Sequence, residues 1–344
     1  MKNKLKIFFL LISFLTILPT ILTGNEKFNF NVTEVEITKE GNRFKGLKRG
    51  TATTEDGIII TADTFDYDKV SNILNAKGDV IIDDTVKDII IYSDNITYLK
   101  NEDKVFTKGK TEALIESKYY FLSSDVLLLR KEKKLSSSSK TRIINEKIKS
   151  YELDEFVYYI DDNLVKGSNI KINSDIRVAM GETDHLKFKD GFFNLNDNTH
   201  KASTTNIRLR KDNFENPEND PRLIGISSSS TKNKTFVNKG IFTSCKQIDG
   251  KCPPWSIKAD KITHDKLKRQ LTYDNAFLRI YDVPVMYFPK FFHPDPTVKR
   301  QSGFLKPQLN KSEILGSSIY LPYFKVISES KDLTFKPTLF DSNI

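Results

Sequence analysis

An aspartate recurs every 31 residues in the first part of this chain, and this spacing constrains the fold more than any other feature. The aspartates are Asp63, Asp94 and Asp125, and Gly78 and Gly109 each follow one of them by 15 positions. A fixed period of this length is typical of proteins in which each unit stacks on its neighbour and shares a continuous apolar face. Coincidence in a chain rich in Asp and Lys is the alternative explanation.

The sequence within and around the repeat indicates β-strands. Tyr67 and Tyr98 follow the first two aspartates by four positions, and Lys258-Ala259-Asp260 repeats the opening of the unit. Apolar and polar residues alternate in short runs bounded by Asp, Asn, Gly and Lys, which is the pattern of half-buried strands. Examples of these runs are 57–62, 79–82, 89–92, 95–99, 126–129, 156–160 and 169–172. Each unit therefore fits a strand, a turn and a return strand.

The chain opens with a candidate export signal. Lys2, Lys4 and Lys6 precede an apolar run over 7–18, and Pro19 to Gly24 supplies breakers and small residues. We expect residues 1–24 to be a signal peptide, with an uncleaved N-terminal anchor as the alternative. No other run of about 20 apolar residues exists, which excludes a polytopic helical membrane protein.

The residue composition and the spacing of apolar residues change after Phe288. Pro289, Pro294 and Pro296 interrupt an aromatic-rich passage, and apolar residues alternate with the residues between them in two later segments, 318–323 and 332–339. This alternation is typical of transmembrane β-strands, although a half-buried antiparallel strand has the same period. Residues 212–239 are rich in Ser, Asn and Pro and are predicted to form a surface loop or ragged connection.

The sequence gives no support for catalysis. It contains no nucleophile elbow, P-loop, dinucleotide fingerprint or zinc-protease motif, and its four histidines are scattered. We predict neither an enzyme nor a cofactor or metal site, and no nucleic-acid binding. The net charge of +9 is compatible with a solvated mixed-charge surface or with a polyanion-binding patch. Cys245 and Cys252 are predicted to form a short disulfide loop if the chain is exported, with two free thiols as the alternative.

Residues 241–339 resemble the LptD family of outer-membrane lipopolysaccharide-assembly proteins. The matching segments are 242–245, 255–260, 283–289, 300–305, 322–324 and 332–334, and the motif residues are Trp255, Asp260, Pro284, Pro289, Arg300, Ser302, Gly303 and Phe304. The repeat region before them is similar, more weakly, to the periplasmic β-jellyroll of that family.

The resemblance implies an all-β chain in three parts: a signal peptide (1–24), a periplasmic open β-jellyroll of stacked antiparallel strands (25–298) and the first strands of an outer-membrane β-barrel (299–344). The jellyroll would receive the acyl chains of lipopolysaccharide from a periplasmic bridge protein of the same type. The barrel would release them through a lateral gate, with an outer-membrane lipoprotein as its plug. Pro307 and Pro322 occupy the positions of the gate prolines, although they could instead merely end or bend strands.

Two departures from the family leave alternatives open. At most three barrel strands precede Ile344, so we expect a truncated or fragmentary chain. Both cysteines lie in one segment, which favours a local bridge over the long-range disulfides of many members. The alternative functions are a soluble periplasmic bridge or scaffold of the same jellyroll type and, less favoured, a secreted carbohydrate-active enzyme.

Overall fold

The computed structural model describes residues 28–146, 149–177, 183–209, 220–246, 254–294, 298, 302–305, 307–312 and 316–341. The predicted signal peptide lies outside these ranges. Within them the secondary structure is entirely β, as the sequence predicts, and no helix there is long and apolar enough to cross a bilayer.

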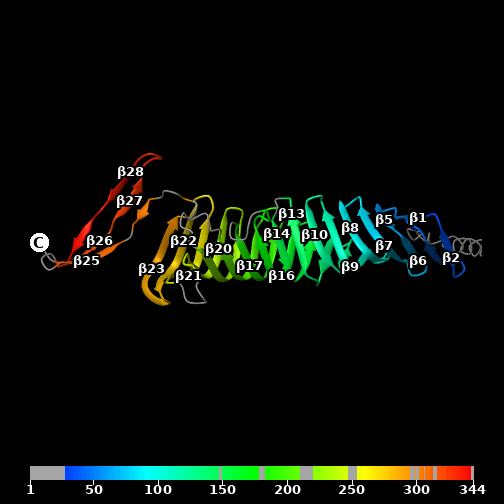
Figure 1. The fold of residues 1–344 in the computed structure, drawn as a ribbon, viewed down its shortest axis with the longest axis horizontal. Coiled ribbons are helices and arrows are strands. Elements are labelled where there is room, and N and C mark those ends of the chain that lie inside the picture. Colours follow the sequence, from blue (N-terminus) through cyan, green and yellow to red (C-terminus); the bar gives the residue numbers. More distant parts are fainter. Residues whose placement is uncertain are drawn as a thin grey trace, which may run out of the picture.

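Among the described residues, 23 strands form one long antiparallel sheet, and six more form two small sheets of three strands. The strands of the long sheet are β1 (Asn29–Asn31), β2 (Val35–Thr38), β3 (Arg43–Gly46), β4 (Gly50–Thr53), β5 (Ile58–Ala62), β6 (Thr64–Asp68), β7 (Ile73–Asp84), β8 (Ile89–Leu99), β9 (Lys104–Ile115), β10 (Tyr119–Ser124), β11 (Leu127–Leu129), β12 (Lys134–Ser137), β13 (Thr141–Asn145), β14 (Ser150–Leu153), β15 (Glu155–Tyr159), β16 (Leu164–Asn173), β17 (His185–Asn194), β18 (His200–Arg208), β19 (Arg222–Ser230), β20 (Lys234–Thr243), β21 (Trp255–Asp265), β22 (Gln270–Ile280) and β23 (Val283–Pro294). The small sheets contain β24 (Gly303–Phe304), β25 (Gln308–Ser312), β26 (Gly316–Tyr320), β27 (Tyr323–Val326), β28 (Asp332–Phe335) and β29 (Thr338–Phe340). Figure 1 shows the strands of the long sheet stacked along the long axis of the molecule, with β25–β28 at the end opposite β1 and β2.

The long sheet folds over on itself into two walls. The C-terminal half of β7 pairs with β5 and its N-terminal half pairs with β6, and β9 is divided in the same way between β10 and β11. Wall 1 therefore contains β4, β5, β10, β13 and β14, wall 2 contains β3, β6, β11, β12 and β15, and the longer strands contribute one half to each. Aromatic rings meet between the walls, as where Phe121 of wall 1 and Phe156 of wall 2 lie 5.5 Å apart.

The repeated aspartates lie at the corner where the strands pass from one wall to the other. Asp63 separates β5 from β6, and Asp125 separates β10 from β11. At Asp94 the pairing of β8 with β9 changes register, so the two runs predicted over 89–92 and 95–99 are halves of one bent strand. Gly109 completes the corner at φ +84°, where its N–H donates to the Asp125 carboxylate at 2.9 Å.

The end turns of both walls lie together on the side opposite the corner, which we call the mouth. Wall 1 contributes the turns 54–57, 85–88 and 116–118, and wall 2 contributes 69–72, 100–103, 130–133, 160–163 and 195–199. Between corner and mouth the alternating residues of both walls form a buried apolar interior.

The prediction of a loop over 212–239 is wrong for much of that segment. Residues 212–219 lie outside the described ranges, but β19 and the first part of β20 occupy most of 222–239. The serines that suggested a loop alternate between the two faces of β19, and Ser228, only 2% exposed, shares a hydrogen bond of 2.8 Å with Thr205. Small hydroxyl side chains can therefore occupy an interior strand when they bond to each other.

Candidate functional site

The interior between the walls is a buried apolar core made of two clusters, and we call this interior the trough. The first cluster runs from Phe28 to Ala202 and the second from Ile207 to Ala276, and Leu186 packs against both. Side chains of Ile, Val, Leu, Phe and Tyr dominate each cluster, as the alternating pattern predicts. The walls therefore provide the apolar environment that hydrocarbon chains favour over water.

A polar layer lies where the two clusters meet. His200 donates or accepts hydrogen bonds with Ser228 at 3.0 Å and with Ser230 at 2.9 Å, and its ring stacks on Phe193. Burial first, and then the charges of Lys266 and Lys149, lower the pKa of His200 to about 4. This imidazole is therefore neutral near pH 7.

Charged side chains join the two walls across the mouth in the N-terminal half of the trough. We call this group the mouth clasp; its members are Asp56, Asp84, Lys87, Lys100, Asp103 and Arg130. Arg130 of wall 2 donates through Nε to Asp84 of wall 1 at 2.8 Å and through Nη1 to Asp103 at 2.9 Å. Arg130 also pairs with Asp56 of wall 1, and Lys100 Nζ donates to the same carboxylate at 2.8 Å.

The centre of the clasp is buried although it consists of charged groups, and the other four members are half-buried. Arg130 is 3% exposed and Asp84 is fully buried. Burial raises the pKa of Asp56, but hydrogen bonds from Lys100, Thr54 and Arg130 outweigh burial and hold that pKa well below its ordinary value. Burial lowers the pKa of Arg130, and hydrogen bonds to Asp84, Asp103 and Asp56 more than reverse this. Asp56 and Arg130 are therefore both ionised near neutral pH.

A further contact crosses the mouth beyond the clasp. Lys149 in the turn before β14 donates to the side-chain carbonyl of Asn198 in a wall 2 turn, at 2.9 Å. Tyr151 also donates to Asn198, at 3.4 Å. Polar contacts thus bridge the walls at two places along the mouth.

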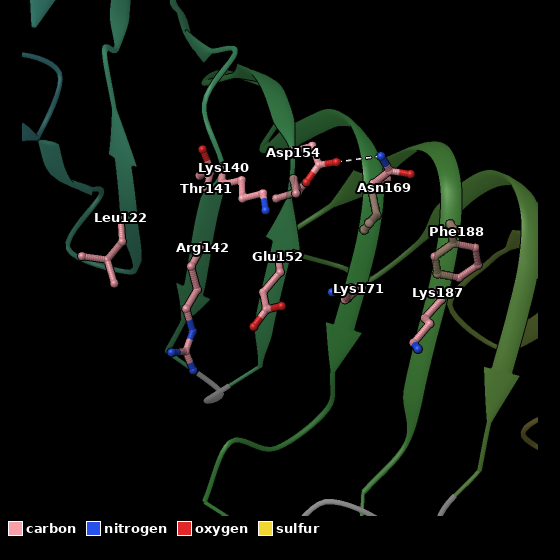
Figure 2. A pocket seen from close by; sticks show the side chains of 12 residues that line it. Leu122, Lys140, Thr141, Arg142, Glu152, Asp154, Asn169, Lys171, Lys187 and Phe188 are labelled. Carbon is pink, nitrogen blue, oxygen red and sulfur yellow. Dashed lines mark hydrogen bonds between the residues drawn. The ribbon is translucent and has the colours of Figure 1, made fainter. Parts of the chain in front are cut away.

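A separate hollow of about 620 Å³ lies on the solvent-facing side of wall 1. Figure 2 shows Arg142, Glu152, Lys171 and Lys187 side by side on successive strands around it, with the Asp154–Asn169 hydrogen bond above them. Bases outnumber acids in this lining. Its charge makes it unsuitable for an acyl chain.

The motif residues Trp255 and Asp260 lie in β21, and Pro284 and Pro289 lie in β23, at the end of the long sheet. Trp255 packs against the second apolar cluster, and Asp260 at a corner of β21 accepts a hydrogen bond from Asn275 at 3.1 Å. Pro284 and Pro289 lie in β23, which pairs only with β22 among the described strands. A proline is tolerated there because an edge strand can lack an N–H donor.

Three prolines interrupt neighbouring strands of the small sheets at adjacent positions. Pro307 separates β24 from β25, Pro322 separates β27 from β26, and Pro337 separates β28 from β29. Pairing resumes beyond each proline, so the six short strands form three longer strands with a common break. At the break the carbonyls of Pro322 and Pro337 accept hydrogen bonds from Leu305 at 2.8 Å and from Leu321 at 3.0 Å.

The register also shifts at this break. Phe304 pairs with Tyr323 and Gln308 pairs with Tyr320, so the first strand has one more residue between these pairs than the second. The second and third strands keep one register across Pro322 and Pro337. The pairing of the first strand is therefore the less regular one.

The remaining predicted residues are placed only in part. Ser302 accepts a hydrogen bond from the Val326 amide at 2.9 Å, while Gly303 and Phe304 form β24. Cys245 is half-buried after β20, but Cys252 and Arg300 lie outside the described residues. The Cys245–Cys252 disulfide therefore stays a prediction. Within the described ranges no cluster of three or more His, Cys, Asp or Glu could hold a metal ion.

Sequence reasoning missed the mouth clasp, although the repeat contained a signal for it. Asp56 and Lys87 are 31 positions apart, as are Asn72 and Asp103, so the repeat places each pair at equivalent turns of successive units. No other clasp residue lies 31 positions from Arg130. Its contacts with aspartates 27 to 74 positions away follow only from the fold.

Comparison with known proteins identifies relatives of this chain. It is 30% identical to "LPS-assembly protein LptD" of Shewanella denitrificans over 166 residues, 47% of this chain and 21% of that protein. It is 32% identical to the protein of the same name from Shewanella frigidimarina over 164 residues, and to that of Legionella pneumophila (strain Paris) over 105 residues. These matches cover 46% and 30% of this chain and 20% and 12% of the two relatives. No protein-family model matches the chain.

The fold and the interior together define an all-β protein in which two walls of stacked antiparallel strands enclose an apolar trough. By sequence, the chain is related to the LptD family of LPS-assembly proteins and corresponds to their N-terminal part. The matched segments span about a fifth or less of these relatives' own length.

Proposed function

We propose that this chain takes part in lipopolysaccharide transport and assembly at the outer membrane, with the trough in the periplasm holding the acyl chains of the glycolipid. The observation that carries the proposal is the apolar interior that follows the whole stack of strands in a relative of LPS-assembly proteins. Each acyl CH₂ exposed to water costs ~0.8 kcal/mol, so several chains need a shielded path across the periplasm.

The small sheets support a role as the first strands of a membrane barrel rather than a soluble bridge alone. Leu309, Ile319 and Leu339 are cross-strand neighbours and are 81%, 45% and 64% exposed. A contiguous row of exposed apolar side chains suits contact with lipid, whereas water penalises it. In the barrel, the break at Pro307 and Pro322 would form the lateral gate, because each proline removes one ladder donor from a wall that must otherwise be fully bonded in lipid.

Edges of the long sheet offer a place for the proposed bridge protein. At the N-terminal end β1 pairs only with β4 and β2 only with β3 among the described strands, so both walls end in an available edge. A jellyroll partner would continue the stack by adding its own strands there. The lipoprotein plug would belong to the barrel.

The acidic residues that the fold brings together do not favour the alternative of a carbohydrate-active enzyme. Asp56, Asp84 and Asp103 converge, but all three are paired with Arg130. A glycosidase needs one protonated carboxylic acid and one carboxylate beside the sugar. A non-enzymatic role in assembly fits the ion pairs better.

Photocrosslinking tests the proposal. Phe121 faces the trough, while its neighbour Tyr120 faces the other side of β10. With benzoylphenylalanine at either position, we expect lipopolysaccharide to be captured at 121 and not at 120. Equal capture at both positions, or none at 121 in a folded protein, would contradict the proposal.

A further inference from the structure

The mouth clasp joins the two walls at their free margins. Asp56 lies in a wall 1 turn and Asp84 ends the wall 1 half of β7, whereas Lys100, Asp103 and Arg130 belong to wall 2 turns. Lys87 of wall 1 adds a hydrogen bond to the backbone carbonyl of Arg130 at 2.5 Å. The group therefore closes the trough over its N-terminal half.

The chemistry of this closure differs from that of the interior beneath it. A buried ion network carries a desolvation penalty, and apolar residues of similar volume often stabilise a fold as well or better. When the two walls separate, however, the charged groups regain water, whereas an apolar seam would expose its surface unfavourably. Hydration of the separated charges therefore offsets part of the free-energy cost of opening an ionic contact between the walls.

From this geometry we infer that the mouth clasp controls lateral opening of the trough, and that acyl chains enter or leave between the walls where Arg130 holds them together. The inference rests on the proposed function for the identity of the ligand. The opening itself is a property of the fold and can be measured without any lipid.

Two alanines permit a matched measurement of opening. Ala113 on β9 is 1% exposed in the first cluster, and Ala276 on β22 is fully buried in the second. Each would be changed to Cys in a full chain that carries Cys245→Ser and Cys252→Ser. The rate at which a water-soluble maleimide modifies each thiol then reports local opening at 113 and at 276.

Each reporter would be combined with Arg130→Met, Asp56→Asn or Arg142→Met. Asp56→Asn is the milder clasp variant because Arg130 keeps Asp84 and Asp103 as partners. Arg142→Met is the control, since it makes the same change at an exposed position on wall 1. We expect the two clasp variants to raise labelling at 113 about tenfold or more, with labelling at 276 unchanged and the control without effect.

Two results would overturn the inference. In one, labelling at 113 stays at the unsubstituted rate in both folded clasp variants. In the other, labelling rises equally at 113 and 276, which means that the clasp stabilises the fold as a whole and controls no local opening.

A crosslinking experiment with lipopolysaccharide distinguishes failure of this inference from failure of the proposed function. Purified lipopolysaccharide would be presented to the Phe121 benzoylphenylalanine variant with and without Asp56→Asn, and faster capture is expected with the substitution. If thiol labelling responds but lipopolysaccharide is never captured, the transport proposal fails while the clasp stands. If capture occurs at the same rate with and without the clasp and labelling does not respond, the clasp inference fails while transport stands.

Discussion

The backbone N–H of Asp63 donates to the carbonyl oxygen of Gly78 at 3.0 Å, joining the break between β5 and β6 to the bend in β7. The glycine has φ +80°, and a Cβ there would lie 2.8 Å from the Cβ of Asp63. The equivalent Gly109 has φ +84° with open space around it. Two glycines of the repeat thus share a backbone conformation but differ in their surroundings.

This difference predicts unequal costs for the same substitution. Gly109→Ala should lower the free energy of unfolding by roughly 1 kcal/mol through the positive φ alone, whereas Gly78→Ala should cost roughly 2–4 kcal/mol because the clash adds to the strain. Urea unfolding of both variants measures this. Equal losses would mean that Asp63 moves aside freely.

Tyr67 and Tyr98 occupy equivalent positions and differ in the acceptor that each hydroxyl reaches. Tyr67 donates to Asn72 at 2.8 Å, while Tyr98 donates to the Asp103 carboxylate of the clasp at 2.7 Å. A hydrogen bond to a charged group contributes more, so Tyr98→Phe should cost about 1.5–3 kcal/mol and Tyr67→Phe about 1 kcal/mol. Denaturant unfolding of the two variants provides the comparison, and the reverse order would contradict it.

His200 should make the stability of the fold depend on pH. Its pKa of about 4 lies below the ordinary value of about 6.5, so the unfolded chain binds a proton more readily between these values. The stabilising contribution is complete above about pH 6.5 and is lost at roughly 1.4 kcal/mol per pH unit as the pH falls toward 4. In His200→Gln this part of the slope should disappear when unfolding is measured at pH 7.5, 6 and 5; an unchanged slope would assign it to other groups.

The clasp should respond to acid in a different range. Because the pKa of Asp56 is lowered in the folded protein, its stabilising contribution is present above the ordinary value of about 4 and is lost as the pH falls further. The difference in melting temperature between the unsubstituted chain and Asp56→Asn should therefore be constant from pH 7 to 5 and shrink below about pH 4. A difference that shrinks already between pH 7 and 5 would place the titration elsewhere.

Local pattern was sufficient for much of the architecture. Alternation predicted strands where β5, β11, β15 and β16 lie, and the aspartate period marked the corners, because both signals depend on residues close in sequence. The two strands expected on either side of Asp94 form one, since a bend at a single residue with continued pairing on both sides looks like a turn in sequence. The partners of Arg130 depend on how the walls face each other, which no local pattern specifies.

The order of pairing has a consequence for how this architecture can change. Within the long sheet each strand bonds only to strands near it in the chain, the most distant pairs being of the kind β3–β6 and β10–β13. Stability in such a stack is close to a sum of unit and nearest-neighbour contributions. Inserting or deleting one whole 31-residue unit would therefore change the length of the stack, and so the distance that the molecule can bridge, while leaving both of its ends intact.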